Sequence, residues 1–151
     1  MLRAYAAHLK KKESSGQSFG DGSFLTFSKG QQALFGFWAY RTHAEQSAND
    51  FTWWTAFFMA HPERWSSVKN GLHLFRDTDT LDLLIEMEGE LIKRGHPLPL
   101  VGFDLSFDDL QKDAQLRDIT LQLHSKLLAS LPKNTGLIGT YIRSHTAEFI
   151  A

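Results

Sequence analysis

The chain has 151 residues, of which 42% are apolar and 22% charged, and its formal net charge is −1. This composition fits one globular domain, residues 1–151, and no apolar run approaches the roughly 18 residues that span a bilayer, which argues against a membrane protein. The lack of cysteine excludes disulfides, thiolate nucleophiles and cysteine-bound metals. Because the first residues also lack the apolar core of a secretory signal, we expect a cytoplasmic protein.

Charged and aromatic residues are unevenly distributed along the chain. Residues 1–76 contain nine Lys or Arg and five acidic residues, whereas residues 77–151 contain seven and twelve. The first part also contains 15 of the 19 aromatic residues. The basic charge and the aromatic surface therefore belong to the same half, and the simplest interpretation is that the two halves attract each other within one fold.

The first thirty residues predict one short helix and an irregular segment. Residues 2–12 have the apolar spacing of an amphipathic helix that ends in three lysines. The segment 14–30 is rich in glycine and serine, which are helix breakers, and it is compatible with a short hairpin near residues 23–28. We therefore expect no second helix before residue 31.

Three helices are predicted in the aromatic part of the chain. Helical spacing runs over residues 31–47, and Asn49 or Asp50 is suited to cap the next helix. That helix ends near His61, and Pro62 suits the first turn of a third one because its missing N–H would have no helical partner there.

The acidic part of the chain begins with the clearest helix signal. Thr78 or Thr80 can open a helix that continues to Arg94, and Gly95 can adopt the left-handed conformation that ends it. Six apolar residues recur at helical spacing along this segment. The pattern is typical of a helix with one face in the core.

A connector and a long helix are predicted next. Residues 96–105 contain two prolines, which favour an extended connector. Ser106 and Asp109 approximate a capping box, which predicts a helix reaching about Leu131, with Pro132 closing it. Residues 136–150 fit helical spacing better than a strand, although two glycines in this region and several β-branched residues leave the strand open. The expected fold is all-α, a single compact domain of five to seven helices.

The stretch from Leu34 to Trp65 contains all four tryptophans and five phenylalanines, more ring surface than one helical face needs. Trp, Tyr and Arg dominate the energetics of protein interfaces. We therefore expect a non-enzymatic binding or adaptor protein that presents an aromatic helical surface to a protein partner or to an identical copy. The residues predicted to contact the partner are Trp38, Tyr40, Arg41, Trp53, Phe57, Arg64 and Trp65.

Two other uses of this surface stay open. Bases stack on aromatic rings and basic groups neutralise phosphates, so the chain could instead be a nucleic-acid-associated accessory subunit, although its near-neutral charge is an objection. The residues for that role are Lys10, Lys11, Lys12, Arg41, Trp53, Arg64 and Lys69. The third interpretation is a helical protein whose aromatic side chains surround a small apolar ligand.

The sequence predicts no catalytic residue, cofactor or metal. The seven histidines occur at separations that no compact zinc motif uses. Glu88, which falls in the apolar arc of its helix, and the acidic cluster 104–113 are expected to serve solvation and helix capping rather than acid–base catalysis. His124 lies on a leucine-rich helical face, where a packed histidine is expected and a pH-sensitive contact is the alternative.

Overall fold

The computed structural model describes residues 24–150, so the helix expected at residues 2–12 and the lysines at 10–12 lie outside the described residues. Within that range all regular structure is helical, which confirms the all-α prediction. The elements are η1 (Phe24–Thr26), α2 (Lys29–Ala44), α3 (Ala48–Met59), α4 (Pro62–Leu74), α5 (Thr78–Ile92), α6 (Phe107–Gln111), α7 (Ala114–Ser144) and η2 (Thr146–Glu148).

The short hairpin suggested for the Gly/Ser-rich segment is absent from its described part, residues 24–30. These residues form the 3-10 turn η1 and the first two positions of α2. Ser28 caps α2, because its hydroxyl accepts the N–H of Gln31 while the Gln31 side chain accepts the N–H of Ser28. This reciprocal capping satisfies the backbone N–H groups of Ser28 and Gln31, which in a hairpin would donate to a neighbouring strand.

Four helix boundaries follow from residues that cap or interrupt helices. Ser47 rather than Asn49 or Asp50 caps α3. Pro62 stands in the first turn of α4, as the sequence predicts. Asp77, the residue directly before α5, caps that helix. After the end of α5 the chain passes through Gly95, which has a φ of 87°. The capping side chains satisfy backbone N–H groups at the starts of α3 and α5, whereas Pro62 lacks the N–H that would have no helical partner.

The long C-terminal helix was predicted with the wrong limits. The Ser106–Asp109 capping box is present, but it opens only the five-residue α6, and Asp113 caps a separate helix α7. Asp113 also forms an ion pair with Arg94 at 2.5 Å, which links the start of α7 to the residues that follow α5. Pro132 does not end α7, which continues to Ser144.

Helix α7 continues through Pro132 because contacts elsewhere hold it. Pro132 and Leu128, whose carbonyl loses its helical donor, are both exposed, so water can replace the missing N–H. Two residues later Asn134 is completely buried and donates to Asp77 at 2.8 Å. The same side chain accepts from Arg41 of α2 at 3.2 Å. The expected helix over residues 136–150 is therefore present as far as Ser144.

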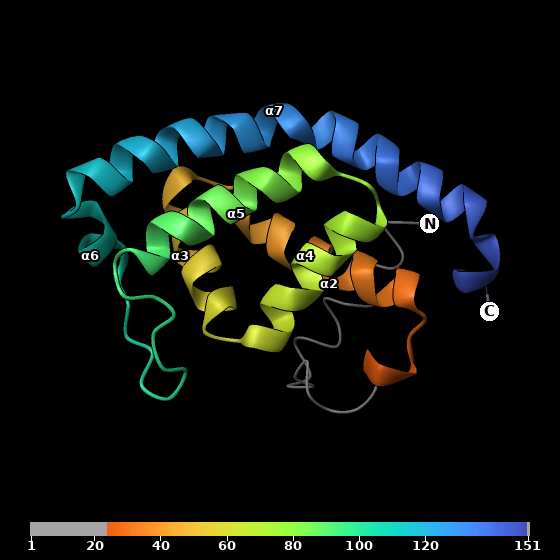
Figure 1. The fold of residues 1–151 in the computed structure, drawn as a ribbon, viewed down its shortest axis with the longest axis horizontal. Coiled ribbons are helices and arrows are strands. Elements are labelled where there is room, and N and C mark those ends of the chain that lie inside the picture. The colour runs from red at the N-terminus through yellow and green to blue at the C-terminus, as the bar shows by residue number, and fades with distance from the viewer. Residues whose placement is uncertain (1–23, 151) are drawn as a thin grey trace.

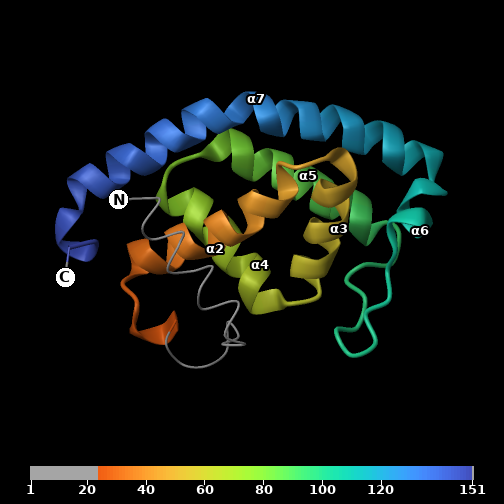
Figure 2. The same cartoon turned by 180° about the vertical axis from the view of Figure 1, so that it is seen from behind.

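One hydrophobic core joins the helices, and α7 arches over the others (Figures 1 and 2). Helices α2 and α4 make the closest pair, and small residues allow their approach. A Cβ atom added at Gly36 would lie 2.4 Å from the Ser67 hydroxyl, and one at Gly71 would lie 2.9 Å from the Ala33 carbonyl. Glycine is therefore required where these two helices cross.

Candidate functional site

The ten aromatic side chains between Leu34 and Trp65 divide evenly between the core and its margin. The buried ones are Phe37, Tyr40, Phe51, Phe58 and Trp65. The half-buried ones are Phe35, Trp38, Trp53, Trp54 and Phe57. The interior therefore absorbs half of the aromatic surface, and only the second group can contact anything outside the protein.

Tyr40 and Trp65 were predicted to contact a partner, but both are core residues. Tyr40 has no exposed surface and Trp65 has 4%. Thr55 donates to the Phe51 carbonyl, so the Tyr40 hydroxyl donates to Thr55 at 2.7 Å, and burial raises the pKa of the Tyr40 phenol well above its usual value. The Tyr40 ring packs edge-on against Trp65 with 5.5 Å between centroids. These two side chains can only support a surface from beneath.

A continuous group of half-buried rings lies on the side of α3 that does not face the core. We call Trp53, Trp54 and Phe57 the aromatic cluster. Trp53 stacks on Phe57 at 5.2 Å, and Trp54 stacks on His43 of α2 at 3.8 Å. Phe57 meets His61 edge-on at 5.0 Å. Helical geometry explains the grouping, because positions three and four residues apart share one face.

The loop of residues 95–106 packs against the aromatic cluster and projects from the body of the protein (Figures 1 and 2). Phe103 lies 5.7 Å from the Trp53 ring and 5.4 Å from the Phe57 ring. The Trp53 indole N–H donates to the Leu105 carbonyl at 2.7 Å. These contacts attach the loop to α3 and leave its outer side free.

The outer side of this loop is apolar. Leu100 is 43% exposed, Val101 94% and Phe107, at the start of α6, 43%. The N–H of Phe103 donates to the Leu100 carbonyl at 3.2 Å, and Gly102 between them has a φ of 77°, as a type II turn requires. We call Leu100, Val101 and Phe107 the loop tip. It adjoins the aromatic cluster, because Phe107 lies 6.2 Å from the Trp53 ring.

The other predicted contact residues, Arg41, Trp38 and Arg64, are on α2 and α4. Arg41 extends toward α7, where it binds Thr135 at 3.0 Å, and it also pairs with Glu45 of its own helix at 3.1 Å. Its guanidinium lies 5.6 Å from the centroid of the half-buried Trp38 ring. Arg64 is half-buried on α4. The aromatic cluster thus contains Trp53 and Phe57 from the predicted set, together with Trp54.

Two basic residues of the nucleic-acid interpretation, Arg41 and Lys69, are paired with acids in the described part of the chain. Lys69 binds both carboxylate oxygens of Glu88 at 2.9 Å, and Arg41 is held by Glu45. Desolvation, with a smaller effect of the charge on Arg64, lowers the pKa of His61. These ion pairs compensate part of the positive charge that would otherwise attract phosphates.

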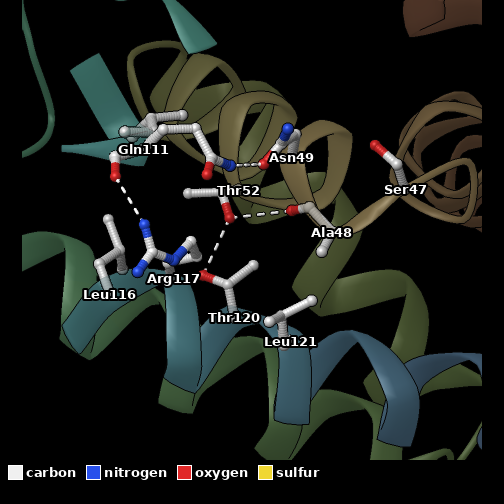
Figure 3. A pocket seen from close by; sticks show the side chains of 10 residues that line it. Ser47, Ala48, Asn49, Thr52, Gln111, Leu116, Arg117, Thr120 and Leu121 are labelled. Carbon is white, nitrogen blue, oxygen red and sulfur yellow. Dashed lines mark hydrogen bonds between the residues drawn. The ribbon is translucent and has the colours of Figure 1, made fainter. Parts of the chain in front are cut away.

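A small hollow lies where the start of α3 meets α6 and α7 (Figure 3). Its volume is about 250 Å³, and polar side chains cross it. Thr52 donates to the Ala48 carbonyl and to Thr120, both at 3.0 Å, while Arg117 donates to the Gln111 carbonyl at 3.2 Å. No tryptophan lines this hollow, so it does not supply the aromatic ligand pocket of the third interpretation.

Glu88 and His124 are accounted for by an ion pair and by packing in the part of the chain that the structure describes. Glu88 reaches Lys69, as expected for an acid at the edge of an apolar face. His124 packs 6.0 Å from the Phe51 ring, and its Nε2 is buried without a hydrogen-bond partner. Across residues 24–150 no three His, Asp or Glu side chains are grouped to hold a metal ion. No helix in this range is long and apolar enough to cross a membrane.

Comparison with known protein families, with curated proteins and with solved structures finds no match to this chain.

Sequence reasoning missed the loop tip. The residues 96–105 were interpreted as a connector because of their two prolines. The available signal was the run Leu100, Val101 and Gly102, which places two apolar residues next to a glycine that favours a turn. Turn residues usually face water, so apolar side chains there indicate a surface that something else can cover.

Proposed function

We propose that this protein is a non-catalytic binding protein that docks onto another protein through the aromatic cluster and the loop tip. The observation that supports the proposal most directly is Val101, an apolar side chain that is 94% exposed on the loop whose Phe103 packs on the aromatic cluster. Burial of a valine, leucine or phenylalanine side chain stabilises a complex by about 1.5 to 3 kcal/mol. Exposed side chains of this kind on the loop and at the start of α6 can therefore contribute to the centre of an interface.

The loop is suited to docking because its shape is already fixed. The Trp53 indole holds the Leu105 carbonyl, and Phe103 is packed on two rings of α3. A loop that is ordered before binding loses little conformational entropy when a partner covers it. The free energy from burying the loop tip then contributes to affinity instead of to ordering the loop.

The charges around the loop tip favour a partner whose contact surface has a basic edge. Asp104 and Asp108 are exposed and follow Phe103 and Phe107 directly in the sequence. Polar and charged groups at the edge of an interface mainly set its specificity and rate of association. The same carboxylates would repel each other across a symmetric pair of copies, so a different protein fits better than a second copy. They would also repel phosphates, which speaks against nucleic acid at this face.

The docking surface can be tested with two matched substitutions. Val101→Asp places a charge in the loop tip, and Ile150→Asp places one at another apolar residue that is 65% exposed. Proteins from a cell extract that bind the unchanged chain are expected to bind the Ile150 variant equally well. We expect at least tenfold weaker binding to the Val101 variant, because a charge buried without a partner is strongly unfavourable.

Self-association is tested in the same experiment series. Sedimentation of the unchanged chain over a range of concentrations gives its mass in solution, and a second copy as partner predicts a dimer that Val101→Asp dissociates. The docking proposal is contradicted if Val101→Asp changes neither the mass nor the amount of any bound protein, since the loop tip then contributes to no interface.

A further inference from the structure

A second and larger hollow lies at the opposite end of α7 from the loop tip. It is formed by the end of α4, the turn that follows it and the last turns of α7, and its volume is about 550 Å³. In both views the turn between α4 and α5 lies beneath the C-terminal half of α7 (Figures 1 and 2). Pockets for small molecules usually have volumes of about 300 to 1,000 Å³. The space is large enough for a ligand of several rings or groups.

The ionisable side chains that line this hollow, apart from the Tyr141 phenol, are basic. Arg76, His73 and His145 line it and are exposed, and none of its nine lining residues is acidic. Within the described residues neither Arg76 nor His73 forms an ion pair or a side-chain hydrogen bond. Glu148 accepts from the hydroxyl of the lining residue Tyr141, but it is also bound by the backbone N–H of Gly30. The hollow therefore offers positive donors with no acidic side chain in its own wall.

Arg76 occupies a backbone position that favours glycine. It follows the last turn of α4 with a φ of 59°, and its N–H donates to the His73 carbonyl at 3.0 Å while the next N–H, of Asp77, donates to Leu72 at 2.9 Å. This is a Schellman motif, in which glycine is the usual residue at the left-handed position. A side chain there costs on the order of 1 kcal/mol. The backbone conformation at this position would therefore suit glycine better than arginine.

Apolar and aromatic surface completes the hollow. Leu74, Phe75 and Leu137 contribute to its wall. The exposed His145 ring is stacked on Tyr141 with 4.1 Å between centroids and an interplanar angle of 12°. A flat ring or another apolar group could pack on these surfaces while an anion reached the basic side chains.

We propose that this hollow binds a small organic phosphate, with the phosphate bound by Arg76 and the organic part packed against the apolar wall. Arginine suits this role because its planar guanidinium can form two parallel hydrogen bonds to phosphate oxygens. The two histidines supply further donors when protonated. This site goes beyond the proposed docking function and uses none of its residues.

Phenyl phosphate is the probe for the first test, titrated into the full chain in a buffer without phosphate and followed by calorimetry and by amide chemical shifts. We expect saturable binding, with shifts confined to the end of α4 and the last turns of α7. Inorganic phosphate, which has no apolar part, and phenol, which has no charge, are each expected to bind at least tenfold more weakly. Absence of binding, or equal affinity for inorganic phosphate and phenyl phosphate, would overturn the proposal.

Substitution of Arg76 separates ligand binding from a structural role. Arg76→Gly removes the guanidinium and relieves the backbone strain, so we expect an unchanged or higher unfolding midpoint together with at least tenfold weaker phenyl phosphate binding. Basic side chains also interact favourably with the C-terminal ends of helices, so loss of the Arg76 charge can affect stability. Arg76→Gln, which removes the charge but keeps a side chain, is therefore the second variant.

Arg143→Gln is the matched control, because Arg143 is exposed near the end of α7 but does not line the hollow. We expect this variant to bind phenyl phosphate as the unchanged chain does. Equal loss of affinity in the Arg76 and Arg143 variants would show general charge attraction in place of a site. Full affinity in Arg76→Gly and Arg76→Gln would exclude Arg76 as the phosphate ligand.

Discussion

Replacement of Gly30 by alanine is expected to reverse the usual effect of this substitution in a helix. Gly30 is the second residue of α2, and its N–H donates to the Glu148 carboxylate at 2.8 Å. An added Cβ would lie 2.6 Å from the Glu148 Oε2, 2.8 Å from the Tyr141 ring and 3.0 Å from the Phe149 ring. The C-terminal turn η2 must therefore move away from α2 if residue 30 gains a side chain.

The expected size of this effect follows from opposing contributions. Alanine in place of glycine normally stabilises a helix by about 0.5 to 1 kcal/mol. Displacement of η2 loses a hydrogen bond worth about 1 kcal/mol at a half-buried site and partial burial of Phe149 and Tyr141 worth about 1 to 2 kcal/mol. We expect Gly30→Ala to lower the free energy of unfolding by about 1 to 2 kcal/mol.

Chemical denaturation measures this free energy, and Gly136→Ala in α7 is the matched control. A Cβ at Gly136 would meet no atom within 4 Å, so this variant is expected to be more stable by about 0.5 to 1 kcal/mol. If both alanine variants were stabilised to the same degree, η2 would not be packed on the start of α2, and the reasoning would be refuted.

Two further outcomes test the C-terminal part of the fold. The Ser28 hydroxyl, followed by the Gly30 N–H and the Tyr141 hydroxyl, lowers the pKa of Glu148. The ionised Glu148 carboxylate therefore stabilises the fold at pH values above the pKa of an unfolded glutamate, and this stabilisation is lost as the pH falls through the pKa of the folded protein. We expect Glu148→Gln to lose less thermal stability on acidification than the unchanged chain. Identical pH profiles for the two proteins would contradict this. Pro132→Ala restores a backbone donor inside α7, where the proline is exposed, and is expected to raise the free energy of unfolding by about 1 to 3 kcal/mol in a denaturant titration. A decrease would mean that α7 depends on the geometry imposed by the proline.

Local signals predicted most of the helices because they act over a few residues. Pro62 and the Ser106–Asp109 box stand where their hydrogen-bonding properties place them. The break before α7 is marked by the N-cap Asp113, whose ion pair with Arg94 joins residues nineteen apart in the chain. Continuation through Pro132 depends on the buried contact between Asn134 and Asp77. The spacing of residues along the chain does not reveal which distant side chains will contact each other in the folded protein.

Only part of the candidate site can be predicted from the sequence, because the exposure of a side chain depends on contacts between distant segments. Trp53 and Phe57 were correctly expected on one face of a helix, since helical periodicity is local. Whether a ring is buried depends on which elements cover it, and Tyr40 and Trp65 proved to be core residues for that reason. The loop tip was missed because its significance lies in its exposure beside Trp53, which the sequence alone does not show.

Helix α7 also has a consequence for synthesis of the protein. Four of its apolar side chains, those of Leu116, Leu123, Leu127 and Ile138, belong to the shared core, and it packs on both α3 and α5. These residues leave the ribosome after all the helices that they cover. The apolar faces of the earlier helices that α7 covers therefore stay open during synthesis until α7 itself has emerged.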